Sequence, residues 1–398
     1  MKKLLKVVLF ILLGLCVIFG GFAVANKINE RAIHEYIDTF GAVEYENQLS
    51  PATDENGVYY FVTDGDFKVM QLTDVHIGGS ILSARKDRMA INAVAAMIST
   101  EKPDLVIVTG DISFAVPWGG TLNNRYAHEI FGHIMENLGV YWTVAFGNHD
   151  SEIYNFYTRE QVATMYESEE LEHCLFDRGP EGLYGECNHV INVRNTAGLV
   201  TRSLIVIDTN SYTDEDPLGF DWIYDNIHED QIEWYRSTIE NLNAYNKTIN
   251  PNAGTVKSMM FFHIPLMEVR DAYNEYLEKG EGEDLKYVRG EVNEKAPYVY
   301  CSEESEEMFE TILELGSTEA MFYGHDHVNN IVFEYKGVTL CYGYSVDYFA
   351  YWQIHKQGAQ RGCTVINCSP DGSFEIVHEN YYQDKYLPLY EKEAVSFE

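Results

Sequence analysis

Five short apolar runs in the sequence each end in a motif built from Gly, Asp, Asn or His. In chain order, these motifs are Asp74-Val75-His76, Gly110-Asp111, Gly147-Asn148-His149-Asp150, His263 and Gly324-His325-Asp326-His327. The runs before them, such as Asp104–Thr109 with the sequence DLVIVT, have the near-continuous apolar character of strands buried on both faces. In open α/β sheets, ligands bind outside the carboxyl ends of the strands. The motifs therefore predict one shared site at the strand ends of an α/β fold.

Segments with helical spacing separate the apolar runs. Arg85–Ser99 and Ala127–Leu138 are predicted helices in the first half of the chain, and Asp230–Tyr245 and Ser302–Leu315 are predicted helices in the second. This alternation of strand and helix predicts a mostly parallel sheet. The charged, glycine-containing segment 270–300 is predicted to be an excursion over the surface.

Each motif alone has a simpler explanation, because Asp-x-His and Gly-Asp occur in ordinary turns and a lone buried His is more often a core residue. All five motifs in this order resemble the calcineurin-like metallophosphoesterase superfamily, over roughly residues 65–380. The segments Leu204–Asp208 and Asp230–Trp234 also resemble a strand and a helix of many members. The resemblance implies a four-layer α/β/β/α sandwich with a two-metal site at the strand ends.

The resemblance also implies a role for each motif residue. The first metal ion is expected to be held by Asp74, His76 and His327, and the second by Asn148, His263 and His325. Asp111 is expected to bridge the ions, and His149 to be the catalytic residue that protonates the leaving oxygen or stabilises its charge. Oxygen and imidazole ligands without thiolate suit Mn, Fe or Zn. In such sites a hydroxide that bridges the two metals attacks the phosphate ester.

Phe114 departs from two patterns of the superfamily. Purple acid phosphatases place an iron-binding Tyr three residues after the bridging Asp, and many protein phosphatases place there an Asp that pairs with the catalytic His. The chain therefore most resembles the purple-acid-phosphatase-like group without this Tyr, and the usual carboxylate partner of His149 is missing. Arg125 is a candidate substrate contact, with a solvated loop arginine as the alternative. The aromatic segment Tyr342–Trp352 either walls the pocket or packs in the core.

The first 25 residues differ from the rest of the chain. Three lysines precede Val7–Ala25, an uncharged run of 19 residues that is long enough to span a bilayer. Ala23-Val24-Ala25 fits a signal-peptidase site, so residues 1–25 are either a cleaved signal peptide or an uncleaved signal anchor. The remaining alternative is a buried core helix. Because the lysines precede the apolar run, the rest of the chain is expected outside the cytoplasm, secreted or membrane-anchored.

The charge balance limits the partners of the chain. With 28 basic and 62 acidic residues, its net charge is −34. This charge opposes binding of nucleic acid or of an anionic membrane over any broad face. Among the seven cysteines there is no Cys-x-x-Cys pair, so a thiolate zinc site is not expected. Export would permit one or two disulfides, and Cys174–Cys187 is the nearest candidate by position.

These observations divide the chain into four parts: a signal peptide or signal anchor (1–25), a stalk (26–60), a calcineurin-like phosphoesterase domain (61–385) and a C-terminal tail (386–398). The predicted function is that of an exported or membrane-anchored, metal-dependent phosphoesterase that hydrolyses a phosphorylated small molecule or another phosphoester. Monoester and diester hydrolysis both remain open. The alternatives are a hydrolase of other esters and a non-catalytic binding protein that retains the fold. An uncleaved N-terminal segment would be the contact with the membrane.

Overall fold

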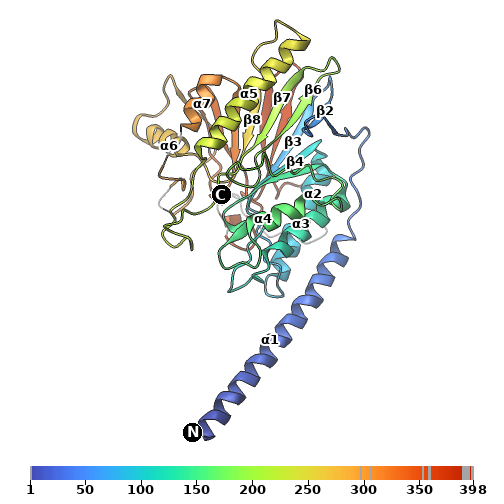
Figure 1. Ribbon diagram of the computed structural model, residues 1–398, viewed down its shortest axis with the longest axis vertical. Helices are drawn as coiled ribbons and strands as arrows, with labels where there is room; N and C mark the ends of the chain where they lie inside the picture. The colour runs from blue at the N-terminus through green and yellow to red at the C-terminus, as the bar shows by residue number, and fades with distance from the viewer. Residues whose placement is uncertain are drawn as a thin grey trace.

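The computed structural model describes residues 2–295, 298–304, 307–351, 354–356, 360–387 and 395. Two β-sheets pack against each other with helices on their outer faces, and one long helix projects from the domain (Figure 1). This arrangement is the four-layer α/β/β/α sandwich that the resemblance implied. Most of the predicted C-terminal tail lies outside the described residues, as does Trp352.

The smaller sheet contains the first three motif-bearing strands. In spatial order its strands are β14 (Phe374–Asn380), β13 (Gly362–Cys368), β3 (Phe67–Leu72), β4 (Leu105–Thr109) and β5 (Trp142–Ala145). The helices α2 (Ala84–Glu101) and α3 (Asn124–Leu138) connect β3 to β4 and β4 to β5, and such crossovers make the three strands parallel. The carboxyl ends of β3, β4 and β5 therefore meet at one edge of the sheet.

The larger sheet contains the other two motif-bearing strands, β8 and β10. In spatial order its strands are β1 (Ala52–Thr53), β2 (Tyr59–Val62), β6 (His189–Arg194), β7 (Val200–Val206), β8 (Ser258–Phe261), β10 (Thr318–Tyr323), β12 (Val338–Tyr342), β11 (Val332–Tyr335) and β9 (Leu285–Arg289). The helices of its outer face are α5 (Glu229–Ile249), α6 (Met267–Lys279) and α7 (Met308–Leu315). Because β8 and β10 are parallel neighbours, their carboxyl ends also meet at one edge.

Side-chain alternation along the strands of the larger sheet separates two hydrophobic cores. On β8, Met259 and Phe261 point between the sheets, and Phe261 stacks on Phe322 of β10 with ring centroids 5.0 Å apart. Met260 and Phe262 belong to the second core, beneath α5, α6 and α7. A strand buried on both faces needs apolar residues at every position, which explains the near-continuous apolar runs of the sequence.

Both sheets are mixed, which differs from the mostly parallel sheet that the alternation predicted. β13 pairs antiparallel with both β3 and β14, and β11 pairs antiparallel with both β12 and β9. The connections within β11–β12 and β13–β14 are short turns, and short turns join only antiparallel neighbours. The segment 270–300 is not only a surface excursion, because it includes most of α6 and the edge strand β9.

The segment predicted as a stalk, residues 26–60, lies against the domain from its first residues. The projecting helix α1 (Lys2–Ile37) continues through the apolar N-terminal run without a break. Near its end, Ile33 and Ile37 are fully buried in the core that includes residues of α2 and α3. After α1 the chain adds β1 and β2 to the edge of the larger sheet. These apolar contacts are the reason that the segment does not behave as a free linker.

The seven cysteines are all free thiols, and all seven lie within the described residues. Cys174 and Cys187, the nearest candidates for a disulfide, are both buried and unpaired. The backbone N–H of Phe146 points at Cys187 Sγ, with N and S 3.3 Å apart. Packing between the layers, rather than covalent cross-links, therefore holds this fold together.

Candidate metal centre

The strand ends of the two sheets converge on the carboxylate of Asp111. This residue follows β4, and its side chain is almost completely buried. His76, which follows β3 of the same sheet, places Nε2 at 3.3 Å from Asp111 Oδ2. His263, which follows β8 of the larger sheet, places Nε2 at 3.1 Å from the same oxygen. Asp111 therefore lies between ligand candidates from both sheets, as a bridging carboxylate must.

The residues predicted for the first metal ion form a tight buried cluster. Ligand atoms of Asp74, His76, Asp111 and His327 all lie within 4.8 Å of one another. Asp74 Oδ2 accepts hydrogen bonds from Thr73 Oγ1 at 2.9 Å and from Ser345 Oγ at 3.1 Å. These bonds to one oxygen fix the orientation of the Asp74 carboxylate at the cluster.

The residues predicted for the second metal ion, Asn148, His263 and His325, follow β5, β8 and β10. Asn148 Nδ2 donates to Tyr212 OH at 2.9 Å, which leaves the buried Asn148 Oδ1 without a hydrogen-bond partner among the described residues. His263 Nδ1 lies 2.7 Å from the carbonyl oxygen of Thr109, so its Nε2 is turned to the cluster. The rings of His263 and His325 lie 5.2 Å apart. A buried oxygen without a partner among the described residues is a donor that fits a metal ion.

Four of the seven predicted ligands adopt the left-handed backbone conformation. The φ angles are 52° at Asp74, 53° at His76, 54° at Asp111 and 76° at His325. For residues other than glycine, this conformation costs about 1–3 kcal/mol each and persists only where the surrounding structure enforces it. Here the backbone N–H groups of Asp74 and His76 donate to the carbonyl oxygens of Gly110 and Asp111. The strain is concentrated where several side chains must point at one place.

Asp347 orients two of the predicted ligands, and the sequence reasoning missed it. Its carboxylate oxygens lie 3.4 Å from Nδ1 of His76 and 3.4 Å from Nδ1 of His327. Three backbone N–H groups, of residues 349, 350 and 351, donate to the same carboxylate. Despite burial, the adjacent His76 holds the pKa of Asp347 well below its usual value. A carboxylate on the far ring nitrogen fixes the near nitrogen toward a metal.

Burial and neighbouring charges act in opposite directions on the histidines of the cluster. Burial, with a smaller contribution from His263, lowers the pKa of His325 well below its usual value. Burial would also lower the pKa of His76, but the carboxylates of Asp347 and Asp111 raise it well above that value. Burial lowers the pKa of His263, but Asp111, Asp74 and the Thr109 carbonyl together raise it to about 9. Metal binding would release protons from the imidazoles of His76 and His263.

His149 has a carboxylate partner after all, and this corrects the expectation drawn from Phe114. His149 begins the short 3-10 helix His149–Ser151, and its Nδ1 lies 2.7 Å from Glu152 Oε1. The Phe114 ring packs edge-on against the His149 ring at 4.9 Å. His149 is 24% exposed, so a substrate can reach it. An acid three residues after a His in a tight turn was the overlooked signal.

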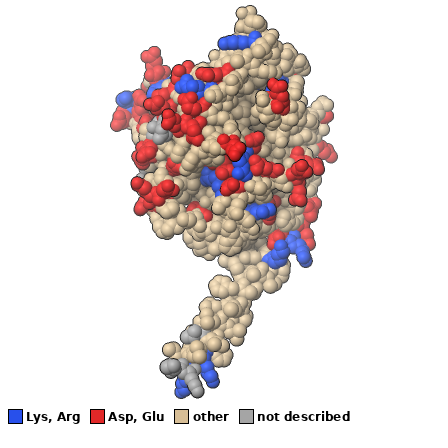
Figure 2. Space-filling model, in the orientation of Figure 1, with Lys and Arg blue, Asp and Glu red and all other residues tan. Residues whose placement is uncertain are grey.

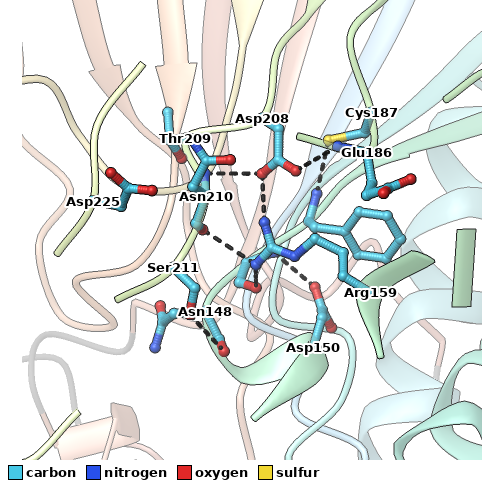
Figure 3. A network of polar contacts seen from close by, with 12 residues as sticks. Asn148, Asp150, Arg159, Glu186, Cys187, Asp208, Thr209, Asn210, Ser211 and Asp225 are labelled. Atoms are coloured by element: carbon cyan, nitrogen blue, oxygen red, sulfur yellow. Dashed lines mark hydrogen bonds and ion pairs between the residues drawn. The ribbon is translucent and has the colours of Figure 1, made fainter. Parts of the chain in front are cut away.

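The Asp of the Gly-Asn-His-Asp motif has a structural role. Asp150 accepts hydrogen bonds from the backbone N–H groups of Asp111, Ser113 and Gly147, at 2.8–3.0 Å. Arg159, in α4 (Arg159–Tyr166), pairs with Asp208 at 2.6 Å and donates to the carbonyl oxygen of Gly147 at 2.8 Å (Figure 3). A Cβ at Gly147 would collide with the Asp111 carboxylate, so only glycine allows this approach.

Arg125, the candidate substrate contact, and Asp326, from the last motif, lie outside the cluster. Arg125 is in the first turn of α3, where its Nε bonds to Glu129 Oε1 at 2.8 Å and its guanidinium lies over the Tyr157 ring. Its role as a substrate contact therefore stays a prediction. Asp326, between His325 and His327, accepts hydrogen bonds from Tyr342 OH and from the backbone N–H of Tyr300. Asp326 thus braces the surrounding loops.

A family model described as calcineurin-like phosphoesterase matches residues 67–329, and the chain belongs to this family. It is 29% identical over 341 residues to "Probable inactive purple acid phosphatase 29" of Arabidopsis thaliana, over 79% of this chain and 80% of that protein. It is 27% identical to "Probable inactive purple acid phosphatase 28" of the same plant, over 73% of each chain. A dimetal phosphatase of Danio rerio superposes with a TM-score of 0.44 and 12% identity, over 76% of this chain and 93% of that chain. The predicted resemblance is confirmed.

The strained backbone at His325 makes a stability prediction for the metal-free chain. His325→Gly is expected to be more stable than His325→Ala by about 1 kcal/mol, because only glycine adopts the left-handed conformation without cost. Urea unfolding of the detergent-solubilised full chain with a chelator measures the difference. At the exposed helical position Asn274 the order should reverse, with Ala more stable than Gly by about 1 kcal/mol. Equal stability of the two His325 variants would contradict the strain.

Proposed function

We propose that the chain is an active, metal-dependent phosphoesterase that hydrolyses phosphate esters. The observation that carries this proposal is the gathering of Asp74, His76, His263 and His327 around Asp111, beside a His149 that has its own carboxylate partner. The names of the two plant relatives describe those proteins as inactive. The complete donor set of this chain favours an enzyme over the alternative of a non-catalytic binding protein.

The donor set fits two transition metal ions of the Mn, Fe or Zn class, since it combines carboxylate and amide oxygens with imidazole nitrogens. When bound, such ions supply positive charge for the phosphoryl oxygens and lower the pKa of water. This charge would also offset the repulsion between an anionic substrate and a chain of net charge −34. Asp347 holds the rings of His76 and His327 in the orientation that leaves their Nε2 atoms free for an ion.

His149 is the proposed acid that serves the leaving oxygen. Glu152 occupies its Nδ1, so its Nε2 is the atom left to donate a proton or a hydrogen bond. The backbone N–H of His149 donates to Asp111 Oδ1 at 2.8 Å, which places this residue directly beside the metal cluster. Contact with Phe114 limits the rotation of the His149 ring. Glu152 therefore acts as a positioning residue for His149.

We also propose that α1 anchors the chain in a membrane, with the domain outside the cytoplasm. The helix is long and apolar enough to cross a bilayer by its length and composition, and its apolar window is not buried in the domain. It continues as one helix through the predicted cleavage site at Ala23–Ala25 and ends in buried contacts of Ile33 and Ile37. These features favour the uncleaved signal anchor over the cleaved signal peptide.

The activity assay that tests the proposal uses the full chain with Mn, Fe or Zn supplied, on aryl phosphate monoesters and diesters. His149→Ala is expected to lower kcat by about 100- to 10,000-fold, as for loss of a general acid. Glu152→Gln is expected to lower kcat with little change in KM, and to have no further effect in the His149→Ala background. Glu160→Gln, an exposed acid of α4, is the matched control.

Three results of this assay would contradict the proposed function or the proposed role of His149. Absence of turnover with every metal would favour the non-catalytic binding protein. Turnover that His149→Ala leaves unchanged would remove His149 from the mechanism. Hydrolysis of a carboxylic ester in place of the phosphate esters would favour the hydrolase of other esters. The same panel separates monoester from diester hydrolysis.

The anchor makes its own prediction about the N-terminus of the mature chain. Chain isolated from the membrane fraction is expected to begin at Met1, because the helix is retained. N-terminal sequencing or intact mass measures this directly. A mature chain that begins at Asn26 would show cleavage after Ala25 and contradict the anchor.

A further inference from the structure

Four large apolar side chains are exposed on the loops that carry the metal centre. These side chains, here called the apolar rim, are Leu82, Trp118, Ile153 and Phe156, and each is between 62% and 75% exposed. Leu82 follows the Asp74–His76 motif, Trp118 follows Asp111, and the other two follow His149. Each loop therefore has one end at the metal centre and carries an apolar side chain in solvent. Exposed aromatic and aliphatic groups gathered around a site mark a contact surface.

Hydrogen bonds join the three loops into one continuous surface. Ser80 Oγ donates to the carbonyl oxygen of Gly119, next to Trp118. The backbone N–H of Phe156 donates to the carbonyl oxygen of Leu122 at 2.9 Å. The loop of residues 78–83 thus holds the loop of residues 114–122, which in turn holds the loop of residues 149–157. The rim side chains therefore belong to one end of the molecule.

The same surface is fastened to α1 at the end of its apolar run. The backbone N–H of Ile81 donates to Asn26 Oδ1 at 2.9 Å, and Asn29 Nδ2 donates to the carbonyl oxygen of Ser80 at 3.2 Å. Asn26 is the first residue after the uncharged run Val7–Ala25. If that run crosses the bilayer, the loop that carries Leu82 lies at the level where the helix leaves it. In Figure 1 the domain sits on the upper end of α1 and its loops reach down beside the helix.

The charge near this end differs from the charge of the whole chain. Arg31 on α1, and Arg85 and Lys86 at the start of α2, lie close to the Asn26–Ile81 contact in the sequence or the fold. Lys27 also lies there, but it pairs with Glu30 at 2.6 Å. Figure 2 shows acidic side chains over much of the visible face, with few of them at the lower end of the domain above α1. Basic side chains beside apolar ones are suited to lipid phosphates.

From this juxtaposition we propose that the apolar rim rests in the bilayer that α1 crosses, and that the substrate is the phosphoester headgroup of a membrane lipid. The proposal rests on the phosphoesterase function and the anchor proposed above. Water supplies the oxygen of the new bond to phosphorus, the ester P–O bond breaks, and the leaving oxygen takes up a proton. The lipid leaving group stays in the bilayer, and the phosphate or phosphate monoester enters the water.

The test uses the full chain reconstituted with metal in phosphatidylcholine vesicles that contain phosphatidic acid or phosphatidylglycerol. Hydrolysis of these lipids is compared with hydrolysis of a soluble aryl phosphate by the same vesicles. The double variant Trp118→Ser/Phe156→Ser is expected to lower the ratio of lipid to aryl phosphate turnover by about tenfold or more, because two interfacial aromatics are lost. Leu277→Ser is the matched control, an exposed leucine on α6 away from α1 (Figure 1), and should leave the ratio unchanged.

A second measurement reports membrane contact without activity. Lipids brominated on the acyl chain quench tryptophan that lies in the bilayer. Trp118→Phe is expected to remove most of the tryptophan fluorescence that brominated lipid quenches. Trp234→Phe, on the distant helix α5, is expected to leave the amount of quenched fluorescence unchanged.

The outcomes separate this inference from the function on which it rests. Lipid turnover that depends on the rim, together with Trp118 quenching, supports the inference. If the chain hydrolyses aryl phosphate but no lipid, or if the rim variant leaves the ratio unchanged, the lipid substrate is wrong. The phosphoesterase function is then retained. If the unaltered chain hydrolyses neither the lipids nor the aryl phosphate, both the phosphoesterase function and the lipid substrate are wrong. Unchanged quenching in Trp118→Phe overturns the membrane contact.

Discussion

The buried carboxylate of Asp111 is the constraint on which the rest of the structure depends. A buried carboxylate is costly unless charges and hydrogen bonds surround it, and Asp111 receives them from both sheets. His76 and His263 approach its Oδ2 at 3.3 and 3.1 Å, and the backbone N–H of His149 donates to Oδ1. The two sheets must therefore pack so that their strand ends meet. The left-handed ligand positions are a consequence, since the chain has to turn its side chains inward within one or two residues of each strand.

The sequence predicted that the candidate ligands would lie together, because their position follows from local rules. Apolar runs mark buried strands, parallel strands share one edge, and polar residues directly after them must gather there. Asp347 and Glu152 were not predicted, because no such local rule gives their positions. Asp347 lies in an aromatic segment with no motif, and only the packing of the two sheets brings it behind His76 and His327. Glu152 is close to His149 in sequence, but its pairing depends on the turn that follows β5.

The layers of the fold were predicted correctly, and the strands at the edges of the sheets were predicted less well. β4 covers the predicted run Asp104–Thr109 except for its first residue, because this apolar run has clear ends. The edge strands β1 and β9 are short or polar, so their sequences carry little strand signal, and they form by pairing with a sheet already present. The contacts of the N-terminal segment with the domain were also not predicted. A stalk is indicated by polar composition, but Ile33 and Ile37 are spaced to bury one face of α1 on the domain, where α1 contacts α2 and α3.

Direct counting of bound metal ions tests the central claim, that the strand ends of both sheets build one two-metal site around Asp111. The full chain is stripped with chelator, loaded with Mn, Fe or Zn, freed of excess metal and analysed by elemental mass spectrometry. We expect about two ions per chain, and about one when Asn148→Leu removes the unpartnered amide oxygen from the second set. A folded wild-type chain that retains no metal, or that retains one ion regardless of Asn148, would contradict it.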